Sequence, residues 1–359
     1  MGSIRYIGSK ARIATSILDL IPARSGARFV DLFCGSGAVS RAAAERGWSV
    51  YANDQLNCAA ILTEGQLVAP FEVPFRQLGG YLEAVRQLNE AAQIDGFIFR
   101  EYSPSGLSHS GHERRYFTTD NARRIDGMRL QIQRWGTDGL VTPTEKRLLL
   151  ADLLEAANGV ASTAGTYGCF MRQWIPRSMA DISLVGRELL PRRNRYAIET
   201  MDAFAVTVRR DDVLYLDPPY TRRQYAAYYH VLETIAQGDE PEVSGVTGLR
   251  PWRHLSSPFC HKRHALNALI HLLRQTPANR VFISYSDQGH IQLSDALAAL
   301  RALGRVELHS VREIGRYRPN RKAAAASSSV SEYLVELHPR LVEQLPDSLA
   351  TPIGSVQDA

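Results

Sequence analysis

Closely spaced cysteines and long apolar runs are both missing from this sequence of 359 residues. The four cysteines are far apart and form no C-x-x-C pair, which argues against a disulfide framework and against a zinc ribbon. Cys260, His261 and His264 are close in the sequence but lack an evident fourth ligand, so no metal is expected. No stretch approaches the roughly 18 to 20 apolar residues of a membrane helix, and no secretory signal precedes residue 20. We therefore expect a cytoplasmic protein with no membrane partner.

A strong excess of one charge is missing as well. The net charge is +5 and the pI is about 9.0, which is compatible with a polyanionic partner but too common to identify one. Hydrophobic residues make up 45% of the chain, enough to bury a full core. The length fits either two domains or one domain with a large insertion.

Short apolar runs bounded by Gly, Asp or Pro are the predicted strands. They cover residues 29–33, 49–52, 196–200, 213–216, 281–285, 306–311 and 333–337. Helical patterns lie between most of them, and this alternation predicts an α/β fold with a twisted, mostly parallel sheet and helices on both faces. The last two runs have no convincing helix between them, so we expect an antiparallel hairpin at one edge of the sheet.

The alternation stops between about Gly65 and Arg193, where arginine-rich helical segments take over. One such segment covers residues 119–135, and another opens with the capping box of Thr142 and Glu145. We therefore predict a sheet domain, a helical insertion and a tail. The sheet domain covers residues 1–64 and 194–338. The insertion covers residues 65–193, and the tail covers residues 339–359.

The most informative motif follows the predicted strand at 213–216 and reads Asp217-Pro218-Pro219-Tyr220. Consecutive prolines fix φ and have no N–H, so the turn is stiff and its prolines offer only carbonyl acceptors. A carboxylate, a fixed carbonyl and an aromatic ring thus meet at one strand end. Such a site suits a flat ligand that stacks on Tyr220 and donates two N–H groups to Asp217 and the Pro218 carbonyl. An aminopurine fits this description.

A glycine-rich turn follows the first predicted strand, with Phe33, Gly35 and Gly37 before a good helix start. Glycines at such a corner let a ligand approach the backbone closely. Asp54 ends the next predicted strand, about twenty residues later, where an acid can accept hydrogen bonds from a ribose. Because no third glycine is in register, a nucleoside without a pyrophosphate is the better ligand, and S-adenosylmethionine qualifies.

The segment between Tyr6 and Lys10 precedes the first strand and has two interpretations. It is either a basic turn that leads into a helix at 11–20, or a segment that closes over the methionine end of the cofactor, where Lys10 could meet a carboxylate. The order of this segment relative to the two motifs above favours the second interpretation.

Together these motifs resemble the Dam-type DNA adenine methyltransferases, amino-methyltransferases with a target-recognition insertion before the D-P-P-Y motif. The resemblance covers nearly the whole chain and extends to residues 225–233, 102–104 and 116–118; Ser162 departs from it, since asparagines are expected nearby. It implies a class I S-adenosylmethionine-dependent methyltransferase fold. It also implies that the cofactor contacts are Tyr6, Lys10, Phe33, Gly35, Gly37, Asp54, Asp202 and Asp217. The residues that would hold the target adenine are Asp217, Pro218, Pro219 and Tyr220.

Arginines of the insertion, interleaved with aromatic residues, predict a surface that contacts the grooves and phosphates of double-stranded DNA. The candidates are Arg114, Arg115, Arg123, Arg124, Arg129 and Arg134. For each single arginine, a solvated helix face is the alternative. A second basic cluster at residues 316–322 fits either a DNA clamp or a solubilising loop.

The expected function is therefore transfer of a methyl group from S-adenosylmethionine to N6 of a flipped-out adenine in a specific sequence of double-stranded DNA. The resemblance implies a restriction-modification or phage DNA-methylation system in a bacterial or phage-infected cell, acting at the nucleoid, with a cognate restriction endonuclease as a candidate partner. Two alternatives stay open. One is a methyltransferase acting on RNA adenine or on a glutamine side chain, and the other is a non-catalytic DNA-binding protein on the same fold.

Overall fold

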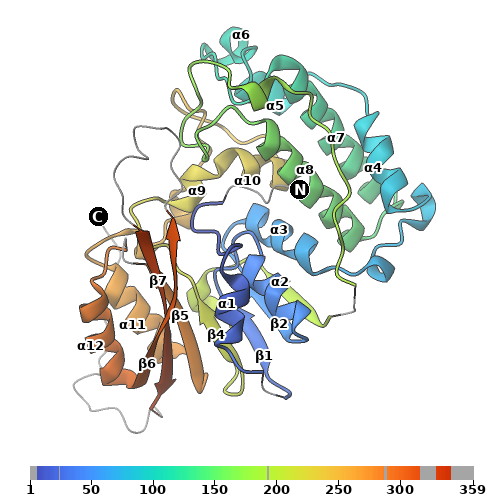
Figure 1. The fold of residues 1–359 in the computed structure, drawn as a ribbon. Helices are drawn as coiled ribbons and strands as arrows, with labels where there is room; N and C mark the ends of the chain where they lie inside the picture. Colours follow the sequence, from blue (N-terminus) through green and yellow to red (C-terminus); the bar gives the residue numbers. More distant parts are fainter. Residues whose placement is uncertain (1–5, 24, 192–193, 287–288, 316–328, 341–359) are drawn as a thin grey trace.

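A seven-stranded sheet forms the centre of the computed structural model, which describes residues 6–23, 25–191, 194–286, 289–315 and 329–340 (Figure 1). The strands are β1 (Arg28–Asp31), β2 (Ser49–Asn53), β3 (Tyr196–Glu199), β4 (Val213–Leu216), β5 (Arg280–Ser286), β6 (Gly304–Gly315) and β7 (Ser329–Pro339). Their order is β3-β2-β1-β4-β5-β7-β6. The pairs from β3 to β5 are parallel, and β7 is antiparallel to both β5 and β6. The predicted strands and the predicted edge hairpin are thus confirmed, and the sheet is that of a class I methyltransferase.

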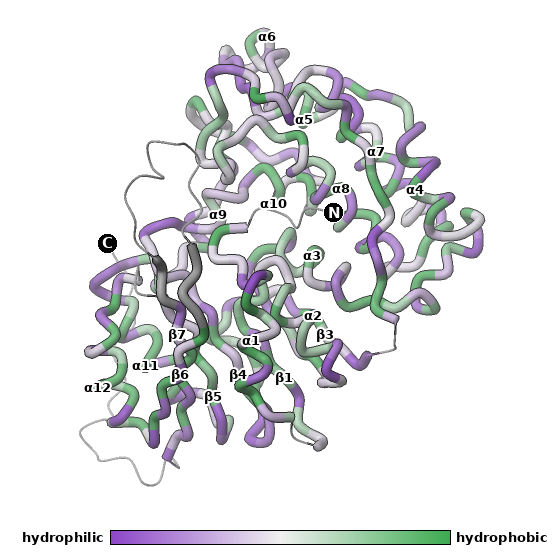
Figure 2. Tube along the Cα trace, in the orientation of Figure 1, coloured by the Kyte–Doolittle hydropathy of each residue, from purple (hydrophilic) through white to green (hydrophobic). Residues whose placement is uncertain are grey.

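Helices cover both faces of the sheet, as the burial of β4 requires. Val213 and Tyr215 pack on the face of α1 (Ala14–Asp19) and α2 (Ala38–Glu45), whereas Leu214 and Leu216 pack on the face of α11 (Ala265–Gln275) and α12 (Leu293–Leu303). All four side chains are buried. A strand that is apolar on both sides is the pattern of a parallel sheet between helix layers. Figure 2 shows hydrophobic residues along the strands and hydrophilic residues in many loops and outer turns.

The insertion is helical, as predicted, and consists mainly of α4 (Tyr81–Asn89), α5 (Phe97–Tyr102), α6 (Gly106–Ser110), α7 (Thr119–Thr137) and α8 (Pro143–Val160). The capping box predicted at the start of α8 is present. The Thr142 hydroxyl accepts from the Glu145 N–H at 3.2 Å, and the Glu145 carboxylate accepts from the Thr142 N–H at 2.8 Å.

The insertion does not have a core of its own. Side chains of α3 (Asn57–Leu67), α7, α8 and α10 (His230–Gln237) belong to one continuous hydrophobic cluster. Cys58 and Ile61 of α3 are buried in it together with Leu153 of α8 and Leu232 of α10. The boundary predicted at residue 65 falls inside α3. The insertion is therefore packed onto the helices that flank the sheet.

The remaining elements are short. They are α9 (Tyr225–Tyr228) and the 3₁₀ turns Pro70–Glu72, Arg76–Leu78, Pro176–Met179, Ala203–Ala205, Arg253–Leu255 and Pro258–Cys260. Among the described helices, none has both the length and the apolar character needed to cross a membrane. The second basic cluster at 316–322 and most of the predicted tail lie outside the described residues.

Candidate active site

A cleft lies where the parallel strands β1, β2 and β4 reach their carboxyl ends, which is where open α/β sheets bind their ligands. Its empty volume, including the open mouth, is about 1040 Å³, the upper end of the range for small-molecule sites. Five separate segments of the chain contribute predicted site residues to its lining. These residues are Tyr6, Lys10, Phe33, Gly35, Asp54, Asp202, Asp217, Pro218, Pro219 and Tyr220.

Gly35 and Gly37 shape the turn after β1, and both have positive φ, at 53° and 79°. A Cβ added at Gly35 would lie 3.0 Å from the Tyr6 ring, so the turn and the N-terminal segment approach closely there. Gly37 differs, because its added Cβ would lie 2.8 Å from Thr63 Cα of α3 and Gly37 does not line the cleft. This glycine lets α2 pack closely against α3, and the cofactor contact expected of Gly37 stays a prediction.

Asp54 is held by the backbone at the end of β2. Its carboxylate accepts from the N–H of Gly35 and from the N–H of Leu56, each at 3.0 Å. Burial raises the pKa of Asp54 to about 6, although these two hydrogen bonds lower it. Because a carboxylate has about four acceptor positions, Asp54 can still accept hydrogen bonds from a ligand in the cleft.

Asp31, at the end of β1, is a cleft residue that the sequence motifs did not single out. One of its carboxylate oxygens accepts from the Ser40 hydroxyl at 2.7 Å, and the other, Oδ1, has no hydrogen-bond partner within the described part of the chain. Burial raises the pKa of Asp31 to about 7. A buried oxygen without a donor is costly, so this position suits a ligand that carries an ammonium or another N–H group.

Lys10 and Asp217 form a buried ion pair at the centre of the cleft. Lys10 Nζ lies 3.0 Å from Asp217 Oδ1, and the Lys10 side chain is 4% exposed. Nζ also lies 3.3 Å from the Tyr220 hydroxyl and 4.9 Å from the centre of the Tyr220 ring. Burial raises the pKa of Asp217 to about 7, the charge of Lys10 lowers it, and the charge of Glu332 raises it. Within the chain, Lys10 is paired with the acid of the D-P-P-Y motif, and its contact with a carboxylate of the cofactor stays a prediction.

Tyr6 is fixed by the helices that follow the D-P-P-Y turn. Its ring stacks on Tyr229, with centroids 4.4 Å apart and planes 6° apart. The N–H of Ile7 donates to the Tyr229 hydroxyl at 2.6 Å, and the Tyr225 hydroxyl donates to the Ile7 carbonyl at 3.2 Å. These contacts bring the segment that carries Lys10 to Asp217.

An aromatic wall closes the cleft beside Asp202. Phe204 and Phe259 lie parallel with centroids 5.9 Å apart, and Phe33 meets Phe259 edge-on at 5.4 Å. Asp202 is exposed and accepts from the N–H of Phe204 at 3.0 Å. Phe204 and Phe259 escaped sequence analysis because they lie in 3₁₀ turns without a motif. The wall suits a flat ring such as a purine.

Of the predicted DNA-contacting arginines, Arg114 is buried, which contradicts its prediction, and Arg129 is only partly exposed. Arg114 is 1% exposed, pairs with Glu101 and donates to the carbonyls of Gly245 and Val246. The Arg129 side chain is 9% exposed and pairs with Asp126. The Arg114 guanidinium therefore cannot reach a phosphate. Arg129 also donates to the carbonyls of Thr234 and Asp239 and lines a surface hollow, so its DNA contact stays a prediction.

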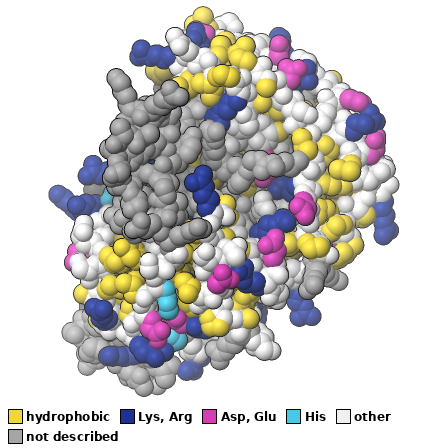
Figure 3. All heavy atoms as spheres, viewed as in Figure 1, with side chains coloured by type: hydrophobic (Ala, Val, Ile, Leu, Met, Phe, Trp, Pro, Cys, Tyr) yellow, Lys and Arg dark blue, Asp and Glu magenta, His cyan; other side chains and the backbone are white. Residues whose placement is uncertain are grey.

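The other predicted arginines lie at the surface of the insertion. Arg115, Arg123 and Arg124 form ion pairs with exposed or half-exposed carboxylates, and Arg134 is exposed. Figure 3 shows Lys and Arg side chains spread over this face of the molecule, with Asp and Glu among them. These positions are accessible to a polyanion.

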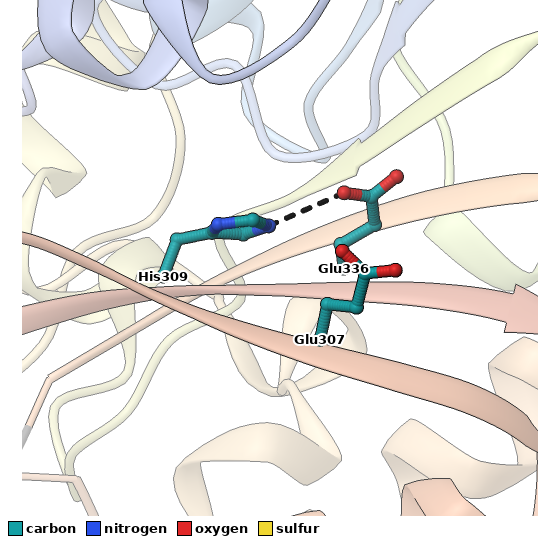
Figure 4. Close-up of side chains that lie close together, drawn as sticks. All are labelled: Glu307, His309 and Glu336. Carbon is teal, nitrogen blue, oxygen red and sulfur yellow. Dashed lines mark hydrogen bonds and ion pairs between the residues drawn. The ribbon is translucent and has the colours of Figure 1, made fainter.

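A group of potential metal ligands lies on β6 and β7, away from the cleft lining. Figure 4 shows Glu307, His309 and Glu336, whose ligand atoms lie within 4.8 Å of one another. Glu336 already pairs with Arg280 at 2.6 Å and with His338 at 3.0 Å. The carboxylate of Glu336, which a metal ion would need as a ligand, is therefore already paired with the Arg280 guanidinium.

The sheet order and the cleft at the carboxyl ends of the parallel strands are those of the class I methyltransferase fold. Residues 6–293 match the D12 class N6 adenine-specific DNA methyltransferase family. The chain belongs to this family, which confirms the resemblance found in the sequence.

Three relatives illustrate the range of the match. The chain is 33% identical over 342 residues to the Type II methyltransferase M.FokI of Planomicrobium okeanokoites, covering 92% of this chain and 52% of that protein. It is 32% identical over 339 residues to M.CviAII of Paramecium bursaria Chlorella virus 1, covering 93% and 98%. It is 29% identical over 323 residues to M.NlaIII of Neisseria lactamica, covering 85% and 90%. The chain spans about half the length of M.FokI and of the modification methylases StsI and LlaI.

Proposed function

We propose that this chain transfers a methyl group from S-adenosylmethionine to N6 of an adenine in a specific sequence of double-stranded DNA. The observation that carries the proposal is the position of Asp217, Pro218 and Tyr220 in the same cleft as Asp54 and the Gly35 turn. The proposed cofactor site then lies beside the proposed site for the amino group that receives the methyl. Membership in the D12 class family supports the same reaction.

The residues of the cleft fit the cofactor. Asp54 suits its ribose, the wall of Phe204 and Phe259 suits its adenine, and the unpartnered oxygen of Asp31 suits its ammonium group. When bound, S-adenosylmethionine supplies an electrophilic methyl group on a sulfonium sulfur, which keeps the bonding electron pair when the methyl leaves.

The protein's part in the reaction is to prepare and orient the adenine amino group. The lone pair of N6 is delocalised into the ring, so Asp217 and the Pro218 carbonyl accept its two N–H groups and return electron density to the nitrogen. These acceptors also stabilise the positive charge that develops on N6 as the nitrogen–carbon bond forms. One N6 proton then leaves, and the Asp217 carboxylate is the acceptor hydrogen-bonded to it. Direct displacement also requires that N6, the methyl carbon and the sulfur lie in line.

DNA binding is assigned to the insertion, residues 65–193, as the target-recognition part. The exposed Arg115, Arg123, Arg124 and Arg134 would contact phosphates or base edges. An adenine inside a duplex cannot reach Asp217, so the base must be flipped out and stacked on Tyr220. Several relatives are named Type II or modification methylases. These names support a role in restriction-modification, with a cognate endonuclease as the partner. The proposed location is the cytoplasm, at the nucleoid.

The test is to incubate the protein with methyl-labelled S-adenosylmethionine and, in parallel, double-stranded DNA, single-stranded DNA and RNA of mixed sequence. The products are then digested and the modified nucleoside is identified. N6-methyladenine from duplex DNA alone is the expected result. Label in RNA or in a protein substrate would favour the alternative methyltransferases, and failure to bind the cofactor would favour a non-catalytic DNA-binding protein.

A further inference from the structure

Glu332 on β7 does not line the cleft itself, but it contacts Lys10, which does. Its Oε1 lies 3.4 Å from Lys10 Nζ, and the contact joins residues 322 positions apart. The side chain is buried, and Oε2 has no hydrogen-bond partner among the residues that the structure describes. The sequence motifs give no role to this glutamate.

The Lys10 ammonium is thus shared between two carboxylates. It lies 3.0 Å from Asp217 Oδ1 and 3.4 Å from Glu332 Oε1. Burial alone would lower the pKa of Lys10, but the charges of Asp217 and Glu332 raise it above its ordinary value, so the ammonium stays charged. One cation faces two anions, and this leaves a net negative charge beside the position of the incoming amino group.

We propose that Glu332 is a positioning residue, which shares the Lys10 ammonium with Asp217 and so leaves the Asp217 carboxylate able to accept the target amino group. The inference rests on the proposed function. In the absence of Glu332, Lys10 pairs with Asp217 alone. The ammonium then competes with the N–H groups of adenine for the same carboxylate oxygens.

The inference has a consequence for pH that a purely structural role would not have. Asp217 accepts hydrogen bonds from the amino group only when it is ionised, so activity falls as the pH drops through its pKa. The negative charge of Glu332 raises that pKa, and its removal therefore moves the acid limb of the pH profile to lower pH. The ionisable groups that face or couple to Asp217 are Lys10, Glu332, Tyr215, Tyr220, Tyr225 and Asp31.

The chain offers a matched control on the same strand. Glu336 lies four residues after Glu332, on the same face of β7, and is also buried. It pairs with Arg280 and His309, whereas Glu332 pairs with Lys10. Glu336→Gln therefore removes a buried carboxylate from β7 without touching Lys10.

The experiment measures kcat and KM between pH 5 and 9 for the wild type, Glu332→Gln and Glu336→Gln, with labelled S-adenosylmethionine and unmethylated amplified genomic DNA. Glu332→Gln is expected to lower kcat about tenfold and to move the acid limb down by about one pH unit, the size expected for one charge nearby. Glu336→Gln is expected to leave the acid limb in place. An acid limb that stays in place in Glu332→Gln overturns the inference, even if overall activity falls. If Glu332→Gln does not fold, Glu332→Asp is measured in its place. This variant keeps the negative charge, so its acid limb is expected to stay at the wild-type pH. A shifted acid limb in Glu332→Asp counts against the inference.

A second readout separates this inference from the proposed function. If the wild type methylates nothing, the proposed function fails, and the carboxyl ¹³C resonance of Asp217, assigned with Asp217→Asn, still reports its titration. A lower midpoint in Glu332→Gln than in the wild type supports the charge coupling. Equal midpoints overturn it.

Discussion

Tyr6 stacks on Tyr229 with ring centroids 4.4 Å apart and planes 6° apart, and this interaction joins the N-terminal segment to the helices after the D-P-P-Y turn. Tyr229 is fully buried and accepts a hydrogen bond from the N–H of Ile7. Lys10 follows on the same segment, so the position of its ammonium depends on this stack. The stack therefore links residues proposed to bind the cofactor to residues proposed to hold the target base.

Tyr229→Phe is expected to keep the stack and remove the acceptor for the Ile7 N–H. Removing one such hydrogen bond costs about 1 to 3 kcal/mol when it leaves a buried donor unpaired. We expect weaker cofactor binding, measured by calorimetry, with a small decrease in thermal stability. Tyr229→Ala should decrease stability as well, by about 3 to 5 kcal/mol. Equal cofactor affinity in the wild type and in both variants would show that the segment is held by other interactions.

Asp217→Ala is expected to slow methyl transfer by orders of magnitude while the fold is retained. Removing an acceptor that stabilises developing charge costs about 10² to 10³ in kcat. Lys10 keeps Glu332 as its partner, so its buried charge is not left unpaired. Turnover is measured with labelled cofactor, and circular dichroism checks the fold. Unchanged turnover would remove the proposed mechanism.

The arginines divide into two groups with different expected phenotypes. Arg123→Ala or Arg124→Ala is expected to weaken DNA binding and to reduce the slope of log affinity against log salt by about one unit for each phosphate that is no longer neutralised. Fluorescence anisotropy at several salt concentrations measures both quantities. An unchanged slope would assign these two side chains to the solvated surface.

Arg114→Ala is expected to affect stability, because its guanidinium is buried and pairs with Glu101. Breaking a buried pair by removing one partner costs about 3 to 5 kcal/mol. The free energy of unfolding in urea is expected to fall by about that amount, and the salt slope of DNA binding to stay at the wild-type value. A stable Arg114→Ala with a reduced slope would reverse the assignment.

Stability and activity are expected to respond to pH in opposite directions between about pH 8 and pH 6. Burial raises the pKa of Asp31 and Asp217 to about 7, above the ordinary aspartate value of about 4. The folded protein therefore takes up protons in this range while the unfolded chain does not, so stability rises as the pH falls. Methyl transfer is expected to decline over the same range, because Asp217 becomes protonated.

Asp31→Asn provides the control for this pH effect. The variant removes one of the two carboxyl titrations near pH 7, so its melting temperature is expected to be higher than that of the wild type at pH 8 and to depend less on pH. Buried His230, whose pKa burial lowers to about 4, acts in the opposite direction below about pH 6.5. The comparison is therefore made above that pH. A melting temperature that is flat from about pH 8 to 6.5 in the wild type would contradict the raised carboxyl pKa values.

The sequence predicted the sheet because its strands carry strong local signals. Val213 to Leu216 is an apolar run that ends at an acid and two prolines, and Asp54 closes another strand. Since the carboxyl ends of parallel strands lie at one edge of a sheet, these residues meet without any further information. The D-P-P-Y turn and Asp54 could therefore be assigned to one cleft in advance.

The sequence did not predict interactions that depend on distant segments. Glu332 stands just before the apolar run predicted as a strand at 333–337, and nothing local shows that its side chain points to Lys10. Arg114 lies between charged and aromatic residues and was predicted to be exposed, because a buried arginine is visible only once its partners Glu101 and Gly245 are placed. Phe259 contributes to the cleft through a loop with no repeating pattern.

The continuous hydrophobic cluster that joins α3, α8 and α10 limits how this protein can be re-engineered. A chimaera cut at residue 65 would divide α3 and separate Leu67 from the rest of its helix. Leu153 and Leu232 are buried in this cluster, and in the chimaera they would pack against side chains of another family member that do not match them in shape. Transplanting the helical insertion between family members as a cassette is therefore expected to fail unless α3 and α10 are carried with it, so changes in sequence preference should be sought by substituting surface residues within the existing insertion.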